Sequence, residues 1–278
     1  MLVLVFLAVV AVIAMLARGA SGGPLDPPGA PGPTDSVRLP GTPINALPFV
    51  TSGPGHYYLT RDLTSTGSNT GVLIQHGEVT LDLMGFTLRG NAGTGTGVLV
   101  NGSFLRSISI RNGTITGFFD GINAFNAVYS QISDVAVLVN GAVIDDGSVA
   151  VRIGAHSVID NCNVSGNTGT GIVASHVTIQ DCFVSDNGGS GIYTPSGHLL
   201  VHDNYLRNND LDGDASESDI RTEGSASLLS DNRFTRPELY GTNDAGLRNA
   251  LCFVTLGNDS VFFPLETTPE GNVFMVIC

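Results

Sequence analysis

The feature that most constrains this chain is a short repeat in its second half. Three segments follow one pattern, with a histidine at the third position: GAHSVIDNCNVSGNTGTG (154–171), ASHVTIQDCFVSDNGGSG (174–191) and SGHLLVHDNYLRNNDLDG (196–213). The same register extends to seven units, roughly 20 to 28 residues apart, that share one column: Gly85, Gly113, Val135, Cys162, Cys182, Asn204 and Asn232. Periods of this length are typical of solenoids, in which one unit cannot bury its apolar face alone and neighbours must stack.

Each unit carries two short apolar runs with the alternation of a β-strand. The first run predicts these inward residues: Val72, Val98, Ile122, Val151, Ile172, Ile192 and Ile220. The second run gives these candidates for a second inward column: Leu83, Ile115, Val137, Val164, Val184 and Leu206. The absence of a sustained helical period, together with 36 glycines and many β-branched residues, predicts an all-β chain with many tight turns.

These patterns resemble the right-handed parallel β-helix proteins of the pectin-lyase-like group, of the secreted bacterial type. The stretch GPGHYYLTRDLT (53–64), followed by VTLDLMGFTLRG (79–90), resembles their N-terminal coil. The G-I-x-x … V-x-x-C-x-V-S-x-N pattern of the later units resembles their repeats. The resemblance covers about Pro54 to Arg236 and implies a single-stranded right-handed parallel β-helix of about seven to eight coils. It implies no single function, because the fold carries lyases, hydrolases, esterases, adhesins and scaffolds.

Two polar columns accompany the apolar ones. The first is predicted to lie at a turn, because Asn and Asp tolerate a left-handed backbone: Asn112, Asp134, Asn161, Asp181, Asp203 and Asp231. The second is predicted to form a ladder of stacked amides that hydrogen-bond along the solenoid axis: Asn140, Asn167, Asn187 and Asn209.

The ends of the chain differ from the repeats. Residues 1–20 begin with the apolar run MLVLVFLAVVAVIAMLA and are predicted to be a signal peptide or a membrane anchor, with anchoring through residues 1–17. Residues 21–48 are a Pro/Gly-rich linker, residues 49–236 the β-helix domain, and residues 237–278 a C-terminal cap or docking segment. Either interpretation of the N-terminus predicts export, to the extracellular space, the cell surface or the periplasm.

Charge limits the partners. The net charge is −13, and all positive side chains are arginines. We therefore expect no nucleic-acid binding, because no basic patch is available to neutralise phosphates.

A ladder along the outward face of the Gly-led strands is the predicted substrate-binding surface, with Asn123, Arg152, Tyr193 and Arg221 as its polar and aromatic members. Arginine can bind a carboxylate with two hydrogen bonds, and tyrosine can stack on a sugar ring. The resemblance implies that, in lyases of this fold, an arginine or lysine in such a groove acts as base, often beside aspartate-bound Ca²⁺. Arg221 is the candidate catalytic residue on that ground.

Two further sets are candidate metal ligands. The insertion NNDLDGDASESD (208–219) gives candidate calcium ligands, although it is not a complete EF-hand loop: Asp210, Asp212, Asp214, Glu217 and Asp219. The alternative interpretation of this insertion is a solvated acidic loop without a bound ion. The histidine column of His156, His176 and His198, with Tyr129 in the unit before, could share a Zn²⁺ or Cu²⁺ ion or could be a packed stack of rings.

The four cysteines leave two arrangements open. Cys162 and Cys182 share a column, so they could form a disulfide or pack as small apolar residues, and Cys252 could pair with Cys278. Enzyme signatures are sparse. Of the N-T-D, D-D, G-H-G and R-I-K motifs of the polygalacturonase-like hydrolases, only Asp145–Asp146 in IDDG resembles one.

These observations predict an exported β-helix repeat protein that binds a polysaccharide or cell-envelope component, or serves as an extracellular scaffold. The first alternative is a calcium-assisted polysaccharide lyase, which rests on Arg221 and the acidic insertion. The second is a structural subunit of a membrane-anchored assembly, which rests on residues 1–17 and the apolar tail.

Overall fold

The structure is a computed structural model that describes residues 40–67, 70–143, 147–211, 219–223, 227–234, 239–242, 250–252 and 255–256. The chain divides into two compact units, Met1–Pro40 and Gly41–Cys278, and the strands of the described residues belong to the second. The described residues contain strands and turns and no helix. Accordingly, no helix among them is long and apolar enough to cross a membrane.

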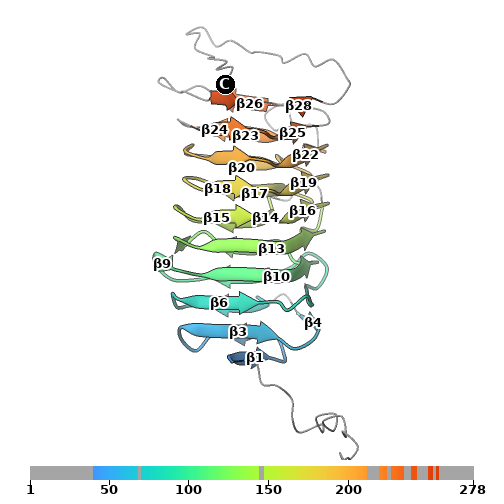
Figure 1. Ribbon diagram of the computed structural model, residues 1–278. Helices are drawn as coiled ribbons and strands as arrows, with labels where there is room; N and C mark the ends of the chain where they lie inside the picture. The colour runs from blue at the N-terminus through green and yellow to red at the C-terminus, as the bar shows by residue number, and fades with distance from the viewer. Residues whose placement is uncertain are drawn as a thin grey trace, which may run out of the picture. The chain divides into compact units, whose positions relative to one another are not determined.

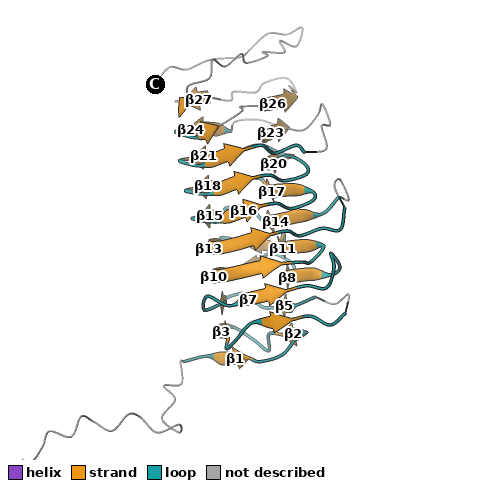
Figure 2. Ribbon diagram, turned by 90° about the vertical axis from the view of Figure 1, so that its right-hand side faces the viewer, coloured by secondary structure: helices purple, strands orange, loops and turns teal. Residues whose placement is uncertain are grey.

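The strands stack into a parallel β-helix, in which each coil lies on the one before (Figures 1 and 2). One side is a nine-stranded parallel sheet of β2 (Phe49–Val50), β5 (Val72–Ile74), β8 (Thr96–Val100), β11 (Asp120–Ala124), β14 (Val149–Ile153), β17 (Thr170–Ala174), β20 (Ile192–Thr194), β23 (Ile220–Glu223) and β26 (Leu239–Thr242). From β5 onward the chain makes about seven turns to Phe234, with strands of a further coil at each end.

The other two sides belong to one 17-stranded sheet that bends along its length. Its first strip contains β1 (Thr42–Ile44), β3 (Gly55–Leu59), β6 (Val79–Asp82), the first halves of β10 (Ser109–Thr116) and β13 (Gln131–Leu138), β15 (Val158–Asp160), β18 (Thr178–Gln180), β21 (Leu200–His202), β24 (Leu228–Ser230) and β27 (Ala250–Cys252). Its second strip contains β4 (Leu63–Thr64), β7 (Thr87–Arg89), the second halves of β10 and β13, β16 (Asn163–Ser165), β19 (Phe183–Ser185), β22 (Tyr205–Arg207), β25 (Arg233–Phe234) and β28 (Thr255–Leu256). A small pair, β9 (Leu105–Arg106) and β12 (Ala127–Val128), widens one corner.

The core is built from columns of β-branched and leucine side chains, which pack well on a pleated surface. The predicted inward residues of the nine-stranded sheet pair in register and are at most 1% exposed, which confirms that column. In the second strip Leu83 is buried in the core, as predicted, but it does not belong to the column of Ile115, because Leu88 is the residue paired with Ile115. Asp82 pairs with Arg111 and Thr87 with Thr114, so the turn after β6 holds extra residues that the alignment skipped.

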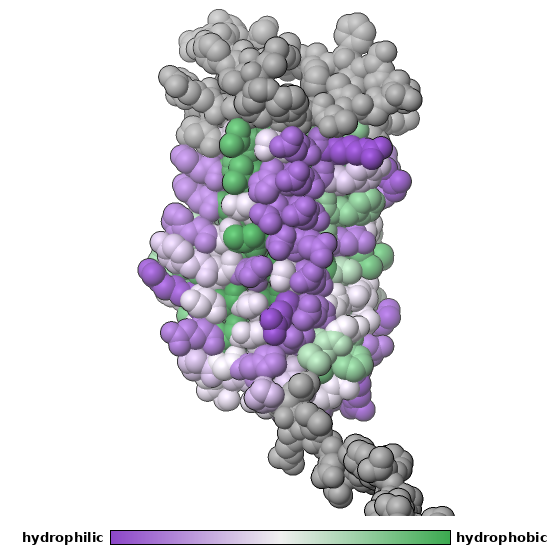
Figure 3. Space-filling model, viewed as in Figure 1, coloured by the Kyte–Doolittle hydropathy of each residue, from purple (hydrophilic) through white to green (hydrophobic). Residues whose placement is uncertain are grey.

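Both polar columns have the predicted geometry. Every residue of the Asn/Asp turn column adopts a left-handed backbone, with φ between 49° and 59°. This column, here called the aspartate corner, joins the two strips and lies in a hydrophilic stripe along the molecule (Figure 3). In the asparagine ladder, each Nδ2 donates to the Oδ1 of the next coil, at 3.1 Å from Asn140 to Asn167 and 2.8 Å for each of the next two steps. Because all four amides are buried, the ladder contributes to stability and does not form a surface site.

The predicted domain limits need correction at both ends of the β-helix. Residues 21–48 were expected to be a linker, yet Thr42–Ile44 forms β1, which pairs with β3, and Ile44 is fully buried. At the other end, β26, β27 and β28 fall within the predicted cap, 237–278, and pair in parallel with β23, β24 and β25. These strands were hard to recognise in proline-rich and nonrepeating sequence, because each of them is only two to four residues long. Residues 1–39 lie outside the described residues, as does the prediction about them.

Candidate functional site

The candidate site is the outward column of the nine-stranded sheet, here called the outer ladder. Strand pairing places Asn123 beside Arg152, Arg152 beside Val173, Val173 beside Tyr193, and Tyr193 beside Arg221. All five residues are half-buried. Neighbouring strands in a sheet lie about 4.7–4.9 Å apart, so the ladder repeats its contacts at that interval along the axis. The structure therefore brings the four predicted binding residues into one straight line.

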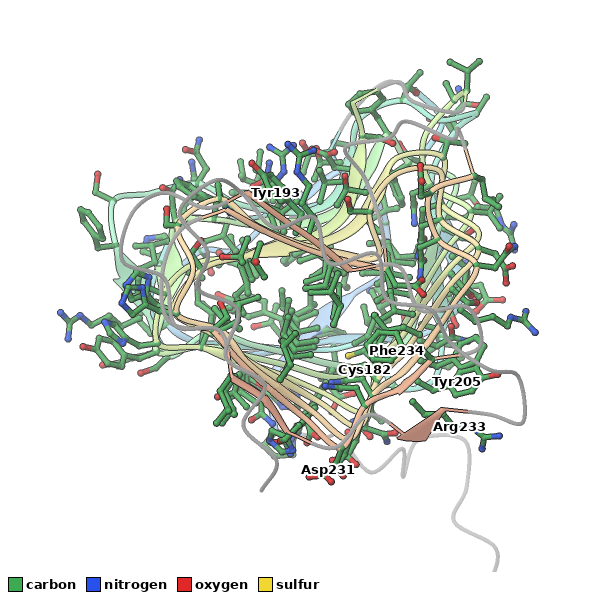
Figure 4. The ribbon with its side chains drawn as sticks, turned by 90° about the horizontal axis from the view of Figure 1, so that it is seen from above. Cys182, Tyr193, Tyr205, Asp231, Arg233 and Phe234 are labelled. Carbon is green, nitrogen blue, oxygen red and sulfur yellow. The ribbon has the colours of Figure 1, made fainter. Side chains whose placement is uncertain are left out.

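Arg221 and Tyr193 make direct contact in this line. The guanidinium carbon of Arg221 lies 4.8 Å from the centre of the Tyr193 ring, within the range of a cation–π interaction. Viewed along the axis, Tyr193 points outward from this side of the coil, while Cys182 and Phe234 point inward (Figure 4). The contact orders both side chains at the surface, and it turns one face of the tyrosine ring away from solvent.

Arg152 lies between Asn123 and Val173 and has a different environment. Its Nε atom is buried and has no hydrogen-bond partner among the described residues. A guanidinium has five N–H donors, so Arg152 retains hydrogen-bonding capacity in the middle of the ladder. The arrangement can bind carboxylate or hydroxyl groups, while Arg221 as a catalytic base stays a prediction.

The predicted calcium ligands are only partly within the described residues. Asp212, Asp214 and Glu217 lie outside them. Asp219 is 2% exposed, and its Oδ1 accepts hydrogen bonds from Asn209 Nδ2 at 2.7 Å and Asn209 N at 3.3 Å. The prediction for Asp219 therefore needs correction: this carboxylate ends the asparagine ladder inside the molecule. The lyase alternative and its calcium ion stay predictions.

The three predicted histidines do form a column. His156, His176 and His198 occupy the same turn of successive coils, above Tyr129, and all four have a left-handed backbone with φ from 51° to 60°. Tyr129 stacks on His156 at 4.9 Å, His156 meets His176 edge to face at 6.3 Å, and His176 stacks on His198 at 4.4 Å. All four side chains are exposed.

This geometry favours stacking over chelation. Imidazole binds a metal through a nitrogen lone pair in the plane of the ring, and the planes of His176 and His198 differ by only 9°, so their lone pairs do not converge. Within the part of the chain that the structure describes, no three His, Cys, Asp or Glu side chains form a group that could hold a metal ion. The zinc or copper site stays a prediction without support from these contacts.

Cys162 and Cys182 face the core as free thiols that form no disulfide. Their Sγ atoms donate to the carbonyl oxygens of Asp160 at 3.2 Å and Gln180 at 3.0 Å. The hydrogen bond with Cys162 and burial together raise the pKa of Cys182. Of the two predicted arrangements, the structure shows packing as small residues. Cys278 and the Asp145–Asp146 pair lie outside the described residues.

The second strip carries a cluster of aromatic and arginine side chains that was not predicted from the sequence. Phe183 and Tyr205 stack at 5.3 Å, Arg207 lies 6.0 Å from the Phe183 ring, and Arg233 lies 5.6 Å from the Tyr205 ring. Tyr205 and Arg233 point outward from a different side than Tyr193 does (Figure 4). The signal was available in the strand sequences FVS, YLR and RF, which place large residues in the same outward column.

One ion pair belongs to this cluster. Arg207 Nη2 donates to Asp186 Oδ2 at 2.9 Å, and Asn208 Nδ2 donates to Asp186 Oδ1 at 2.9 Å. Desolvation alone would raise the pKa of Asp186, but the hydrogen bonds from Asn208, Arg207 and Ser185 outweigh it and lower that pKa. Asp186 is therefore held as an anion that neutralises Arg207, which leaves less charge for a ligand here than on the outer ladder.

Parallel strands wound in stacked coils around one core define this molecule as a parallel β-helix protein. The family described as "Right handed beta helix region" matches residues 70–234, which is more than half of the chain. The chain therefore belongs to the right-handed β-helix family, and the predicted handedness is confirmed. No curated protein matches the chain.

Two solved structures are similar to this chain at low identity. The A-module of the mannuronan C-5 epimerase AlgE4 from Azotobacter vinelandii is 11% identical, with a TM-score of 0.43 over 77% of this chain and 80% of that chain. The pectate lyase Pel9A is 13% identical, with a TM-score of 0.47 over 81% of this chain and 67% of that chain. The assignment of the fold rests on the strand pairing and the family match and not on these two likenesses.

Proposed function

We propose that this β-helix is an exported protein that binds a polysaccharide along the outer ladder. The observation that carries the proposal is the register that aligns Asn123, Arg152, Tyr193 and Arg221 on one face. A polymer of similar units needs a surface with regularly spaced contacts, and strands about 4.7–4.9 Å apart supply one. Export rests on the apolar run at residues 1–17, as predicted from the sequence.

The chemistry of the ladder favours a polysaccharide that carries carboxylates. Two of its side chains are arginines, in a chain whose net charge is −13. Arginine binds a carboxylate through two parallel hydrogen bonds, and Arg152, which is half-buried in the middle of the ladder, is placed for that role. Asn123 and the Tyr193 hydroxyl can hydrogen-bond sugar hydroxyls. Binding requires only this face, whereas catalysis would also require an acid, a base or a metal at a defined place.

The experiment compares two arginine variants of the full chain. Isothermal titration with polygalacturonate and with alginate should show binding by the unchanged protein. The Arg152→Ala/Arg221→Ala double variant should lose at least about tenfold in affinity, because a charge-assisted hydrogen bond contributes about 1.5–3 kcal/mol.

Arg233→Ala is the matched control, since Arg233 also lies over a tyrosine, at 5.6 Å, but on another side of the coil. Equal losses in the double variant and in Arg233→Ala would remove the outer ladder as the binding face. If no acidic or neutral glycan bound to the unchanged protein, the proposed function would be wrong.

A further inference from the structure

The corner between the nine-stranded sheet and the first strip carries a second candidate binding line. It consists of Arg106, Tyr129, His156, His176 and His198, here called the histidine corner. Backbone hydrogen bonds fix its register: Tyr129 N donates to Ala155 O at 3.2 Å, His156 N to His176 O at 2.7 Å and His176 N to Gly197 O at 3.2 Å. The guanidinium carbon of Arg106 lies 5.0 Å from the Tyr129 ring. The line thus spans successive coils with one ring from each.

From this geometry, we infer that the histidine corner is a proton-dependent binding site for an acidic polysaccharide, separate from the outer ladder. The rings of this corner lie against one another, with His176 and His198 stacked at 4.4 Å. On protonation, the rings repel each other, and both nitrogens of each ring become donors. An extended polyanion laid along the corner removes that repulsion, because it places a negative group opposite each positive ring.

The surroundings of the histidines favour this response. Within the described part of the chain, none of the three histidines forms an ion pair with a carboxylate, whereas His202 binds Asp203 at 2.8 Å. The charged and titratable groups at the same corner include Arg106, Tyr129, His76 and Glu78, and Glu78 N donates to Arg106 O, which places Glu78 at the Arg106 end of the line. Glu223 is the last residue of β23, the strand that leads into this corner one coil beyond His198. Positive charge that appears on the histidines is therefore left for a ligand to neutralise.

Desolvation, followed by the charges of His198 and His156, lowers the pKa of His176 from its ordinary value of 6.5. The imidazole of His176 is therefore harder to protonate in the free protein than an ordinary histidine. A bound polyanion screens its neighbours and raises that pKa, so binding and proton uptake are coupled.

Exposed aromatic side chains beside the histidines favour a carbohydrate over other polyanions. Phe104 is 77% exposed and Phe125 is 69% exposed. They lie on the loops of β9 and β12, which pair at this corner, and Leu105 N donates to Asn126 O at 2.9 Å. Flat apolar rings beside cationic groups suit a sugar chain, because the ring faces of the sugar are apolar and its substituents are polar.

The test is titration of the full chain with polygalacturonate at about pH 8 and at about pH 5, on either side of the ordinary histidine pKa. We expect the affinity to rise at least about tenfold at the lower pH, because each exposed ion pair contributes a few-fold. The His156→Asn/His176→Asn/His198→Asn variant should lose this gain, since asparagine tolerates the left-handed backbone but carries no charge. His202→Asn is the matched control and should keep it.

Three outcomes would overturn the inference. They are an equal affinity at both pH values, a gain that persists in the triple variant, and an equal gain with linear polyphosphate, which lacks sugar rings. The Arg152→Ala/Arg221→Ala variant separates the two sites, because arginine stays charged throughout and the acid-dependent gain should survive in it. If the triple variant does not fold, nuclear magnetic resonance titration of the histidines in the unchanged protein decides, with their midpoints expected to rise when the polymer is added.

Discussion

Replacement of Asn187 by alanine is the sharpest test of what holds successive coils together. Asn187 is fully buried and makes four side-chain hydrogen bonds to neighbouring coils. Its Nδ2 donates to Asn209 Oδ1 at 2.8 Å and to Val164 O at 3.1 Å. Its Oδ1 accepts from Asn167 Nδ2 at 2.8 Å and from Asn167 N at 3.2 Å. One substitution therefore removes contacts on both the preceding and the following coil.

The expected loss follows from those four bonds. A buried hydrogen bond contributes about 1 kcal/mol net, so the sum is about 4 kcal/mol. The true loss approaches or exceeds this sum because the partners of Asn187 stay buried without it, and an unsatisfied buried group costs about 1–3 kcal/mol. Since a domain is typically stable by about 5–15 kcal/mol, the variant should be close to the limit of folding.

The assay is urea unfolding followed by far-ultraviolet circular dichroism. At a slope of about 3 kcal/mol/M, a loss of about 4 kcal/mol moves the midpoint down by about 1.3 M. Asn163→Ala is the control, because Asn163 is exposed on β16 and its Oδ1 accepts only from Ser165 Oγ at 2.9 Å. The control should cost less than about 0.5 kcal/mol. If Asn187→Ala cost no more than Asn163→Ala, the ladder would not be a stabilising element and the reasoning would be refuted.

Two further predictions concern titratable groups. The folded-state pKa of Asp186 is lowered from 3.8, so its interactions stabilise the protein above that pH, and this stabilisation is lost as the pH falls through the folded-state pKa. Between about pH 5 and about pH 2, the Asp186→Asn variant should therefore lose less free energy of unfolding than the unchanged protein. Urea unfolding measures this, and an equal loss in both proteins would contradict the prediction. The thiols of Cys162 and Cys182 are buried, and the pKa of Cys182 is raised. In a Cys252→Ser/Cys278→Ser variant, these two thiols should therefore react with Ellman's reagent only after unfolding in urea. Fast reaction of the folded protein would show that the core opens at these residues.

The coil pattern was readable from sequence because in a solenoid each position repeats one environment. Val151 and Ile172 share an inward column, and Asp181 and Asp203 share a left-handed turn. Residues at the same position of the repeat therefore have the same backbone conformation and the same surroundings. Leu83 was assigned to the column of Ile115 because successive coils do not have the same length at this point. The turn between Asp82 and Thr87 is longer than its counterpart in the next coil, and no column of residues marks the extra length.

The outer ladder was predicted correctly as a line but not as a set of contacts. Alternation within each strand gives the direction of Tyr193 and Arg221, and the repeat gives their coils. Their 4.8 Å contact depends on side-chain rotamers, which neither pattern determines. The same limit applies to the histidine column: the sequence left a packed stack of rings and a metal site as alternatives, and the 9° angle between the planes of His176 and His198, which favours the stack, depends on rotamers.

Asp219 shows how a repeat protein can disguise a structural residue as a ligand. In sequence it ends an acidic insertion and immediately precedes a strand, which is where an oxygen ligand would be expected. In the structure, the ladder of asparagines needs an acceptor after Asn209, because each amide donates to the coil that follows it. Asp219, in the next coil, supplies that acceptor: its Oδ1 lies 2.7 Å from Asn209 Nδ2. An aspartate is sufficient at this last position, because its side chain does not have to donate a hydrogen bond to a further coil. Successive asparagines of the ladder are 20 to 27 residues apart, whereas Asp219 follows Asn209 by only 10 residues. Asp219 therefore reaches the ladder from the turn before β23, and not from the position that the asparagines share.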